Sequence, residues 1–392
     1  MVGVVQYQNY GLIRIIQNVQ ITMKKSTENT QVGLSKINSS GNLCPFRSSD
    51  REIHKSKNKI DIYCEEPKFR WSDDLERWVC FDPIIIKEVL TDDDFRVIDY
   101  LGTQTILTNH LDLNMDHISK LLSKLPFCHD GQAHKELKKI YAKKLNEHYE
   151  IALLNFEASL ENLIALKIRP GVSLDLVEEI IAPAIVASAS IFSGSQYHFE
   201  GNSASISQVL DETISISRRI KINKKIEDFM DKFPKNISED TGYIRVGLAV
   251  TGLDTLVGSL SESIATILNR DPDLKLSKIN WDENLPATNI PFTERVLKKD
   301  KIIQGEQLKS GQRIRLYIDA AGYSKKSASY SELYFGAGSH TCIGKSFSKE
   351  LWKVFTKCLS KVDLKLQIIK SARKDHDYFF NGFYLLEVNV RS

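Results

Sequence analysis

A single cysteine stands in a glycine-rich stretch near the C-terminal end of the sequence. Residues 335–344 read FGAGSHTCIG, and an amphipathic helix is predicted directly after them at residues 345–359. Glycines let a backbone pass close under a flat group, where side chains would clash. Backbone N–H groups at the start of a helix can stabilise the thiolate of Cys342. Such a loop suits the axial ligand of a heme iron, because a thiolate donates electron density that favours cleavage of an O–O bond.

The residues of this stretch leave three other interpretations open. Cys342 could be a free thiol buried in a glycine-rich turn. Gly336 and Gly338 could begin a dinucleotide-binding loop, although the third glycine comes too late and the pair does not open a βαβ unit. His340 and Cys342 could bind zinc, although no second pair of ligands lies nearby.

The pattern F-x-x-G-x-x-x-C-x-G, which runs from Phe335 to Gly344, resembles the heme-binding signature of the cytochrome P-450 family. The resemblance implies that Cys342 binds the iron of heme b (iron protoporphyrin IX) and that Phe335 covers the sulfur. It also implies that His340 faces a heme propionate. The order of segments from about residue 60 to residue 392 resembles the same family.

A second chemically informative stretch, LAVTGLDTLV, occupies residues 248–257. A helix that is apolar on all sides is a buried helix, and a buried Asp254 requires a partner. Gly252 weakens the helix, and a local opening there could host water and a ligand. The family has a similar A/G-G-x-D/E-T pattern, which implies that Asp254 and Thr255 deliver protons to iron-bound dioxygen. The alternative is a helix cap or a core threonine.

Two further segments contain candidate partners for the heme propionates. His134 and Lys138 are four residues apart and lie on one face of a predicted helix. The family has H-x-x-x-R here, so the resemblance implies that both hold a propionate, with Lys138 acting as a point charge instead of a bidentate arginine. Arg295 matches a strand arginine that reaches a propionate in the family. A solvated helix face, or a zinc site of His129 and His134 that lacks further ligands, is the alternative for the helical pair.

The chain departs from the family pattern most clearly at the E-x-x-R motif. Glu283 could begin the E-x-x-R motif, but the residue three positions later is Pro286, which offers no charge and interrupts a helix. We therefore expect a loosely held heme, since Lys138 also replaces an arginine.

The remaining segments predict one large domain that is mostly α with small β-sheets (α+β). The heme is expected between the buried helix and the cysteine loop with its helix. We expect an N-terminal extension at residues 1–45 and the cytochrome P-450 domain at residues 46–392. The other predicted elements are a hairpin at 69–81, a helix at 84–90, a substrate-covering loop at 96–125, a helix at 172–194 with Ser173 as its cap and Gly194 past its end, lid helices at 204–236 and a hairpin at 378–384.

Composition excludes several classes of protein. The net charge of +3 is small and the lysines are interleaved with glutamates, so no nucleic-acid surface is expected. The six cysteines are scattered, which is typical of reduced thiols in the cytoplasm. No window approaches the roughly 20 apolar residues of a membrane span. We expect a cytoplasmic monomer without a membrane anchor.

The leading functional prediction is a heme-thiolate monooxygenase that inserts one oxygen atom from O2 into a small organic substrate in specialised metabolism. No flavin or iron–sulfur domain is fused to the chain, so a ferredoxin or flavodoxin with its reductase is expected to supply electrons. One alternative is a heme-thiolate enzyme that catalyses dehydration, isomerisation, coupling or peroxide-driven oxidation. Another is a degenerate, non-catalytic relative that stabilises a partner enzyme.

Overall fold

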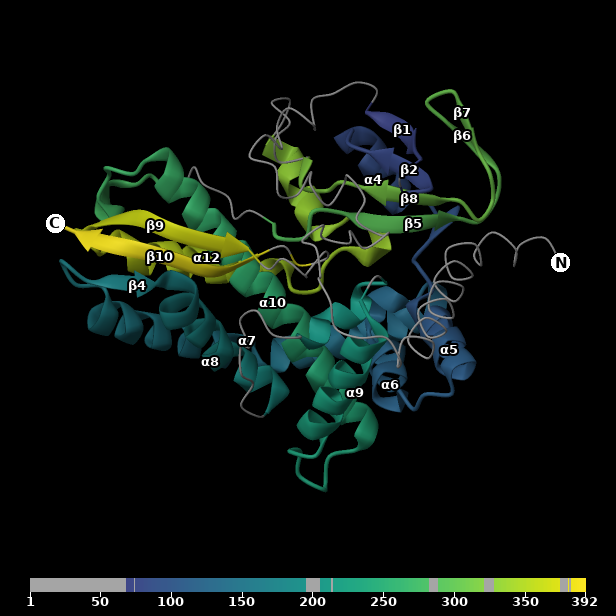
Figure 1. The fold of residues 1–392 in the computed structure, drawn as a ribbon, viewed down its shortest axis with the longest axis horizontal. Helices are drawn as coiled ribbons and strands as arrows, with labels where there is room; N and C mark the ends of the chain where they lie inside the picture. The colour runs from purple at the N-terminus through teal and green to yellow at the C-terminus, as the bar shows by residue number, and fades with distance from the viewer. Residues whose placement is uncertain are drawn as a thin grey trace, which may run out of the picture.

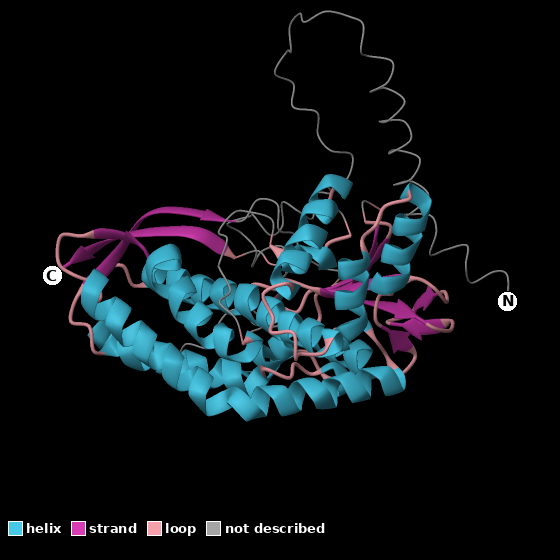
Figure 2. Cartoon of the chain, turned by 90° about the horizontal axis from the view of Figure 1, so that it is seen from below, coloured by secondary structure: helices cyan, strands magenta, loops and turns pink. Residues whose placement is uncertain are grey.

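The computed structural model describes residues 68–194, 205–281, 288–320, 328–373, 380 and 382–392, apart from 74 and 213. The expected extension at 1–45 lies outside these residues, as do Glu283 and Pro286. Helices make up most of the described chain, and small sheets lie at two ends of the helical body (Figures 1 and 2). The predicted architecture, mostly α with small β-sheets, is confirmed.

Helix α10, Glu239–Arg270, passes through the middle of the molecule (Figure 1). The Ser238 side chain caps it by accepting a hydrogen bond from the N–H of Thr241. Residues buried in the core occur on every side of α10, as the apolar stretch 248–257 predicts. The helix remains α-helical at Gly252, so the local opening expected there is not observed. Among the described helices, α10 alone is long and apolar enough to span a membrane, but 61% of its most apolar window is buried inside the protein.

Three other helices contribute much of the main core. Helix α7, Gly131–Lys167, packs against α8, Ala182–Ser193, and against α12, Lys345–Ser360. Phe347, Leu351 and Phe355 bury one face of α12, which confirms the amphipathic helix predicted after the cysteine loop. Helix α8 packs in turn on α10. The cysteine loop therefore leads directly into the largest hydrophobic cluster of the protein.

A five-stranded sheet forms the second layer, and its order is β1-β2-β8-β5-β3. Strands β2 and β8 are parallel, and the other pairs are antiparallel. Helix α4, Pro83–Thr91, follows β2; Asp82 caps it, and proline occupies its first turn. The predicted hairpin at 69–81 and the predicted helix after it are confirmed. The strands are β1, Phe69–Ser72; β2, Arg77–Cys80; β3, Phe95–Arg96; β5, Thr293–Leu297; and β8, Arg313–Leu316.

The prediction of a loop at residues 96–125 is wrong, because two helices occupy most of this segment. Helix α5, Tyr100–Leu111, begins where the Asp99 carboxylate accepts a hydrogen bond from the N–H of Gly102. Helix α6, Asp116–Lys124, is amphipathic and buries Leu121 in the main core. Helix α6 packs against α9 and α10, and α5 packs on α6 (Figure 1).

The predicted helix at 172–194 is only partly correct. Residues Ser173–Asp175 form strand β4, which pairs with β10, so Ser173 does not cap a helix. A π-helical turn, Val177–Ile181, precedes α8. The end of the helix is predicted correctly, since Gly194 adopts φ 67° just beyond it, a conformation that glycine reaches without strain.

The lid and the C-terminal hairpin complete the description. The predicted lid contains a 3₁₀ segment, η3 (Ile206–Leu210), and helix α9 (Ile216–Met230). Strands β9 and β10 are antiparallel; the tip of the predicted hairpin at 378–384 lies largely outside the described residues. The remaining elements are β6, Lys301–Ile303; β7, Glu306–Leu308; β9, Lys365–Arg373; β10, Phe383–Arg391; η1, Pro126–Cys128; η4, Leu276–Lys278; η5, Ala328–Phe335; and η6, Gly338–His340.

Candidate functional site

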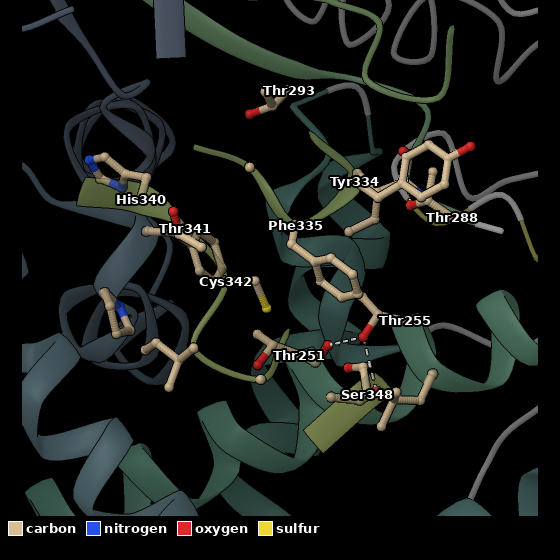
Figure 3. A pocket seen from close by; sticks show the side chains of 18 of the residues that line it. Thr251, Thr255, Thr288, Thr293, Tyr334, Phe335, His340, Thr341, Cys342 and Ser348 are labelled. Carbon is tan, nitrogen blue, oxygen red and sulfur yellow. Dashed lines mark hydrogen bonds between the residues drawn. The ribbon is translucent and has the colours of Figure 1, made fainter. Parts of the chain in front are cut away.

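A cavity of about 400 Å³ lies between α10, α7 and the cysteine loop. Most of its wall is apolar, with side chains from helices α7, α8, α10 and α12 and from several connecting segments, and strand β5 contributes polar residues. Figure 3 shows the sulfur of Cys342 pointing into this space, with Thr251 and Thr255 of α10 nearby. The two stretches that the sequence singled out therefore meet at one cavity.

The cysteine loop is held by its own backbone. The N–H of Cys342 donates to the carbonyl of Phe335 over 2.7 Å, which closes the loop. Gly336 and Gly338 have φ of 71° and 64°, values that favour glycine. A side chain at Gly338 would also come within 3.0 Å of the Leu90 carbonyl at the end of α4. In this structure Gly338 thus serves the close approach of α4 as well as the turn itself.

The thiol of Cys342 differs from the other described thiols. Cys80, Cys128 and Cys358 are buried in the core, and burial raises the pKa of Cys80 to about 12. Burial also raises the pKa of the Cys342 thiol, but the backbone N–H groups of Gly344 and the following residue and the charge of Lys138 act in the opposite direction. Phe335 and Cys342 both border the cavity (Figure 3); that the Phe335 ring covers the sulfur stays a prediction.

One face of α7 contacts the cysteine loop directly. The ammonium of Lys138 donates to the carbonyls of Ser339 and Thr341, over 2.5 and 2.9 Å. The Nε2 atom of His134 lies 3.0 Å from the same Ser339 carbonyl. Both residues border the cavity, as expected from their spacing, but Lys138 bonds to the loop, and His134 contacts the loop and the carbonyl of Pro126.

Strand β5 and the cysteine loop both offer groups that suit carboxylates. Arg295 on β5 borders the cavity with only 8% of its surface exposed, and its guanidinium donates to two neutral oxygens, Thr293 Oγ1 and the Glu294 carbonyl. The Nδ1 atom of His340 is buried and has no hydrogen-bond partner among the described residues. Buried cations and polar atoms need partners, so two propionate groups would satisfy this end of the cavity. With the thiol of Cys342 and the apolar walls, these residues fit a heme.

Burial lowers the pKa values of Arg295 and His340, the two groups that would face the propionates. It lowers the pKa of the Arg295 guanidinium, an effect that the nearby Asp130 opposes. It also lowers the pKa of His340, despite the hydrogen bond between His340 Nε2 and Asp130 Oδ1 at 3.1 Å. An anionic group bound here would favour the protonated form of both side chains.

The predicted pair Asp254 and Thr255 is divided between two sides of α10. The hydroxyl of Thr255 borders the cavity and donates to the carbonyls of Thr251 and Gly252, over 2.6 and 3.0 Å. The carboxylate of Asp254, 4% exposed, accepts hydrogen bonds from hydroxyls in the segment that carries η3. Successive helix residues point about 100° apart, so neighbours on one helix need not share a cavity.

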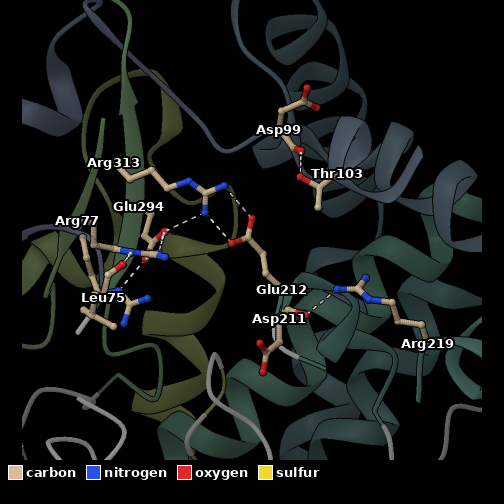
Figure 4. A network of polar contacts seen from close by, with 10 residues as sticks. Leu75, Arg77, Asp99, Thr103, Asp211, Glu212, Arg219, Glu294 and Arg313 are labelled. Atoms are coloured by element: carbon tan, nitrogen blue, oxygen red, sulfur yellow. Dashed lines mark hydrogen bonds and ion pairs between the residues drawn. The ribbon is translucent and has the colours of Figure 1, made fainter. Parts of the chain in front are cut away.

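Sequence reasoning missed a charged network beside the cavity. The buried carboxylate of Glu294 pairs with Arg77 and Arg315, over 2.5 and 2.7 Å. Arg313 stands between Glu294 and Glu212 of the lid segment (Figure 4). Burial alone would raise the pKa of Glu294, but the three arginines outweigh burial and bring it to about 2. The partners are far apart in the sequence, and no local pattern indicates them.

A second cluster, of two glutamates and a cysteine, could in principle bind a cation. Glu157, Glu161 and Cys358 are close enough to share a cation. Lys357 and Lys361 already pair with the two glutamates, over 2.9 and 2.7 Å. These contacts are ion pairs between α7 and α12.

No protein-family model matches the chain, and no curated protein matches it. Solved structures do. A structure of P450BioI in complex with an acyl carrier protein ligated to hexadec-9Z-enoic acid superimposes with a TM-score of 0.66 at 16% identity, covering 87% of this chain and 100% of the other. CalO2 gives a TM-score of 0.67 at 14% identity, covering 88% and 98%. A thermophilic cytochrome P450 from Sulfolobus tokodaii gives 0.64 at 17% identity, covering 86% and 100%. At these identities the likeness shows the fold.

Proposed function

We propose that this chain, which has the cytochrome P450 fold, is a heme-thiolate monooxygenase that inserts one oxygen atom from O2 into a small organic substrate of specialised metabolism. One observation carries the proposal: the thiol of Cys342 faces the same cavity as Thr255 of the buried helix and the buried guanidinium of Arg295. A thiolate ligand, a hydroxyl on the opposite wall and a cation for carboxylates are the parts this chemistry requires.

The protein side chains would divide the work as follows. Cys342 would ligate the iron as the thiolate, and Phe335 would keep water from the sulfur. Arg295 and His340 would hold the propionates of heme b by charge-assisted hydrogen bonds. A bound heme supplies the activation of dioxygen with two external electrons. The apolar walls would exclude water and bind an apolar part of the substrate.

Thr255 is the residue we assign to proton handling. Its hydroxyl donates backward to two carbonyls of its own helix, which leaves its lone pairs available to a donor in the cavity. It can therefore accept a hydrogen bond from water there and pass a proton onward by rotating its O–H. Asp254 would contribute only if its carboxylate left the serine hydroxyls that hold it.

The proposal includes the surroundings of the enzyme. We place it in the cytoplasm as a monomer, with a ferredoxin or flavodoxin and its reductase as the electron donor. One structural neighbour was solved with an acyl carrier protein; for the present chain we propose only a small organic substrate.

The position of Asp254 favours one alternative. Because the carboxylate is directed away from the cavity, proton delivery from it is not prearranged. A heme-thiolate enzyme that uses peroxide, which already carries the electrons and protons, needs no such delivery. Product formation with hydrogen peroxide, and none with NAD(P)H and redox partners, would establish this alternative.

The test of the proposed function is the coupling of electron use to oxygenated product. We expect Thr255→Ala to keep heme and substrate binding but to divert electrons to peroxide, since a positioned proton-transfer group contributes on the order of 10² to 10⁴ in rate. Thr266→Ala is the matched control, because Thr266 makes the same backward bond, to Glu262, on an exposed part of α10. Unchanged coupling in Thr255→Ala would remove Thr255 from the mechanism.

A further inference from the structure

Three residues spaced one helical turn apart contact the segment that precedes Cys342. Asp130, His134 and Lys138 follow the i, i+4, i+8 spacing that places side chains on one face of a helix. Asp130 contacts His340, His134 contacts Ser339, and Lys138 contacts Ser339 and Thr341. We call Asp130, His134 and Lys138 the α7 clamp.

Asp130, the first member of the α7 clamp, does not cap its own helix. Asp130 occupies the N-cap position of α7, where an aspartate normally accepts a hydrogen bond from the helix, but its side chain makes no such bond. One carboxylate oxygen instead faces His340 Nε2 at 3.1 Å. The other accepts from the N–H of Val97 over 2.9 Å. Asp130 thus ties the cysteine loop to the segment between β3 and α5.

The second and third members fix the loop backbone. The His134 ring lies between two carbonyls, with Nδ1 2.8 Å from that of Pro126 and Nε2 3.0 Å from that of Ser339. Its ring centroid is 3.9 Å from that of His340. Lys138 donates to the carbonyls on both sides of His340. Hydrogen bonds from a charged donor are the stronger kind, so Lys138 is the member whose removal should matter most.

We propose that the α7 clamp positions Cys342, with Lys138 bound to the loop carbonyls and not to a heme propionate. Cys342 is then held from both sides, by the clamped residues before it and by α12 after it. The role of Cys342 as a heme ligand rests on the proposed function. The contacts that hold the loop do not depend on that function.

Hydrogen–deuterium exchange of the full-length protein, before and after heme reconstitution, tests the clamp. Lys138→Met removes the ammonium but keeps an unbranched side chain, and the exposed neighbour Lys139 provides the control variant, Lys139→Met. We expect amides of residues 336–342 to exchange about tenfold faster or more in Lys138→Met, because hydrogen bonds to charged groups contribute about that factor. Lys139→Met should exchange like the parent, and Lys138→Arg should restore much of the protection.

A second variant tests the clamp independently, in case Lys138→Met does not fold. Asp130→Ala removes both carboxylate contacts without removing a helix cap, so α7 should remain intact while the loop loosens. In the reconstituted protein, Lys138→Met should also increase the fraction of reduced carbon monoxide complex that lacks thiolate ligation.

The opposite pattern overturns the proposal. If Lys138→Met leaves loop exchange equal to that of Lys139→Met and only weakens heme binding, Lys138 serves the propionate. If the parent protein binds no heme, the proposed function fails, while the exchange comparison without heme still decides whether the clamp exists.

Discussion

Replacing Glu294 with glutamine should destabilise the protein. The carboxylate lies between Arg77 and Arg315 with 5% of its side chain exposed, and Arg313 approaches within 3.9 Å. Glutamine keeps the size of the side chain but removes the charge. The three guanidinium groups would then lose the carboxylate that they share, while Glu212 would still pair with Arg313.

The pKa of Glu294 gives the expected size of this effect. It falls from 4.5 to about 2 in the folded protein, and about 1.4 kcal/mol per pKa unit gives roughly 3 kcal/mol of stability. Removal of one partner of a buried ion pair typically costs about 3–5 kcal/mol. Because the folded pKa is the lower one, the contribution is fully present above pH 4.5 and is lost as the pH falls through about 2.

Urea unfolding of the parent and of Glu294→Gln at pH 7 measures the difference. Glu332→Gln is the matched control, because Lys349 and Lys345 also lower the pKa of Glu332 to about 2, but its side chain is 54% exposed. Solvent screens such a pair, so this control should change stability little. Near pH 3 the parent and Glu294→Gln should approach each other in stability. Equal unfolding midpoints for the two variants at pH 7 would refute the reasoning, since burial would then make no difference.

Two further changes test other parts of the site. Arg295→Ala should lower heme retention, because the buried guanidinium is the cation that faces the cavity from β5. Competition with apomyoglobin for heme measures the retention. A variant that keeps heme as well as the parent does would mean that Arg295 holds no propionate. Glu212→Gln removes the ion pair with Arg313 that links the lid segment to the sheet, so ligand-induced spectral shifts should develop faster in stopped-flow experiments; an unchanged rate would show that this link does not limit access to the cavity.

Local patterns predicted the elements that carry the chemistry. The spacing around Cys342 and the apolar run that becomes α10 are both visible in short windows, and both meet at the cavity. The resemblance predicts a loop between residues 96 and 125, whereas the local pattern indicates helices there. Asp99 as a cap and the apolar spacing of Ile118, Leu121 and Leu122 would have indicated them.

Contacts across long stretches of sequence could not be predicted. Glu294 meets Arg77 across 217 positions, and Asp130 meets His340 across 210. Which side of α10 faces the cavity also depends on the packing of the lid, so the sequence could not separate Asp254 from Thr255. Of the residues in these contacts, only Asp130 could be placed from the sequence, because it lies one turn before His134 on the same face of the helix.

The spectrum of the reduced carbon monoxide complex tests the central claim most directly. If Cys342 is the axial thiolate, the reconstituted protein should show the strongly red-shifted Soret band of thiolate ligation, and Cys342→Ser should abolish it. Cys358→Ser, which alters a thiol buried in α12, should leave the band in place. A parent protein without the band, or a Cys342→Ser protein that retains it, would contradict the account.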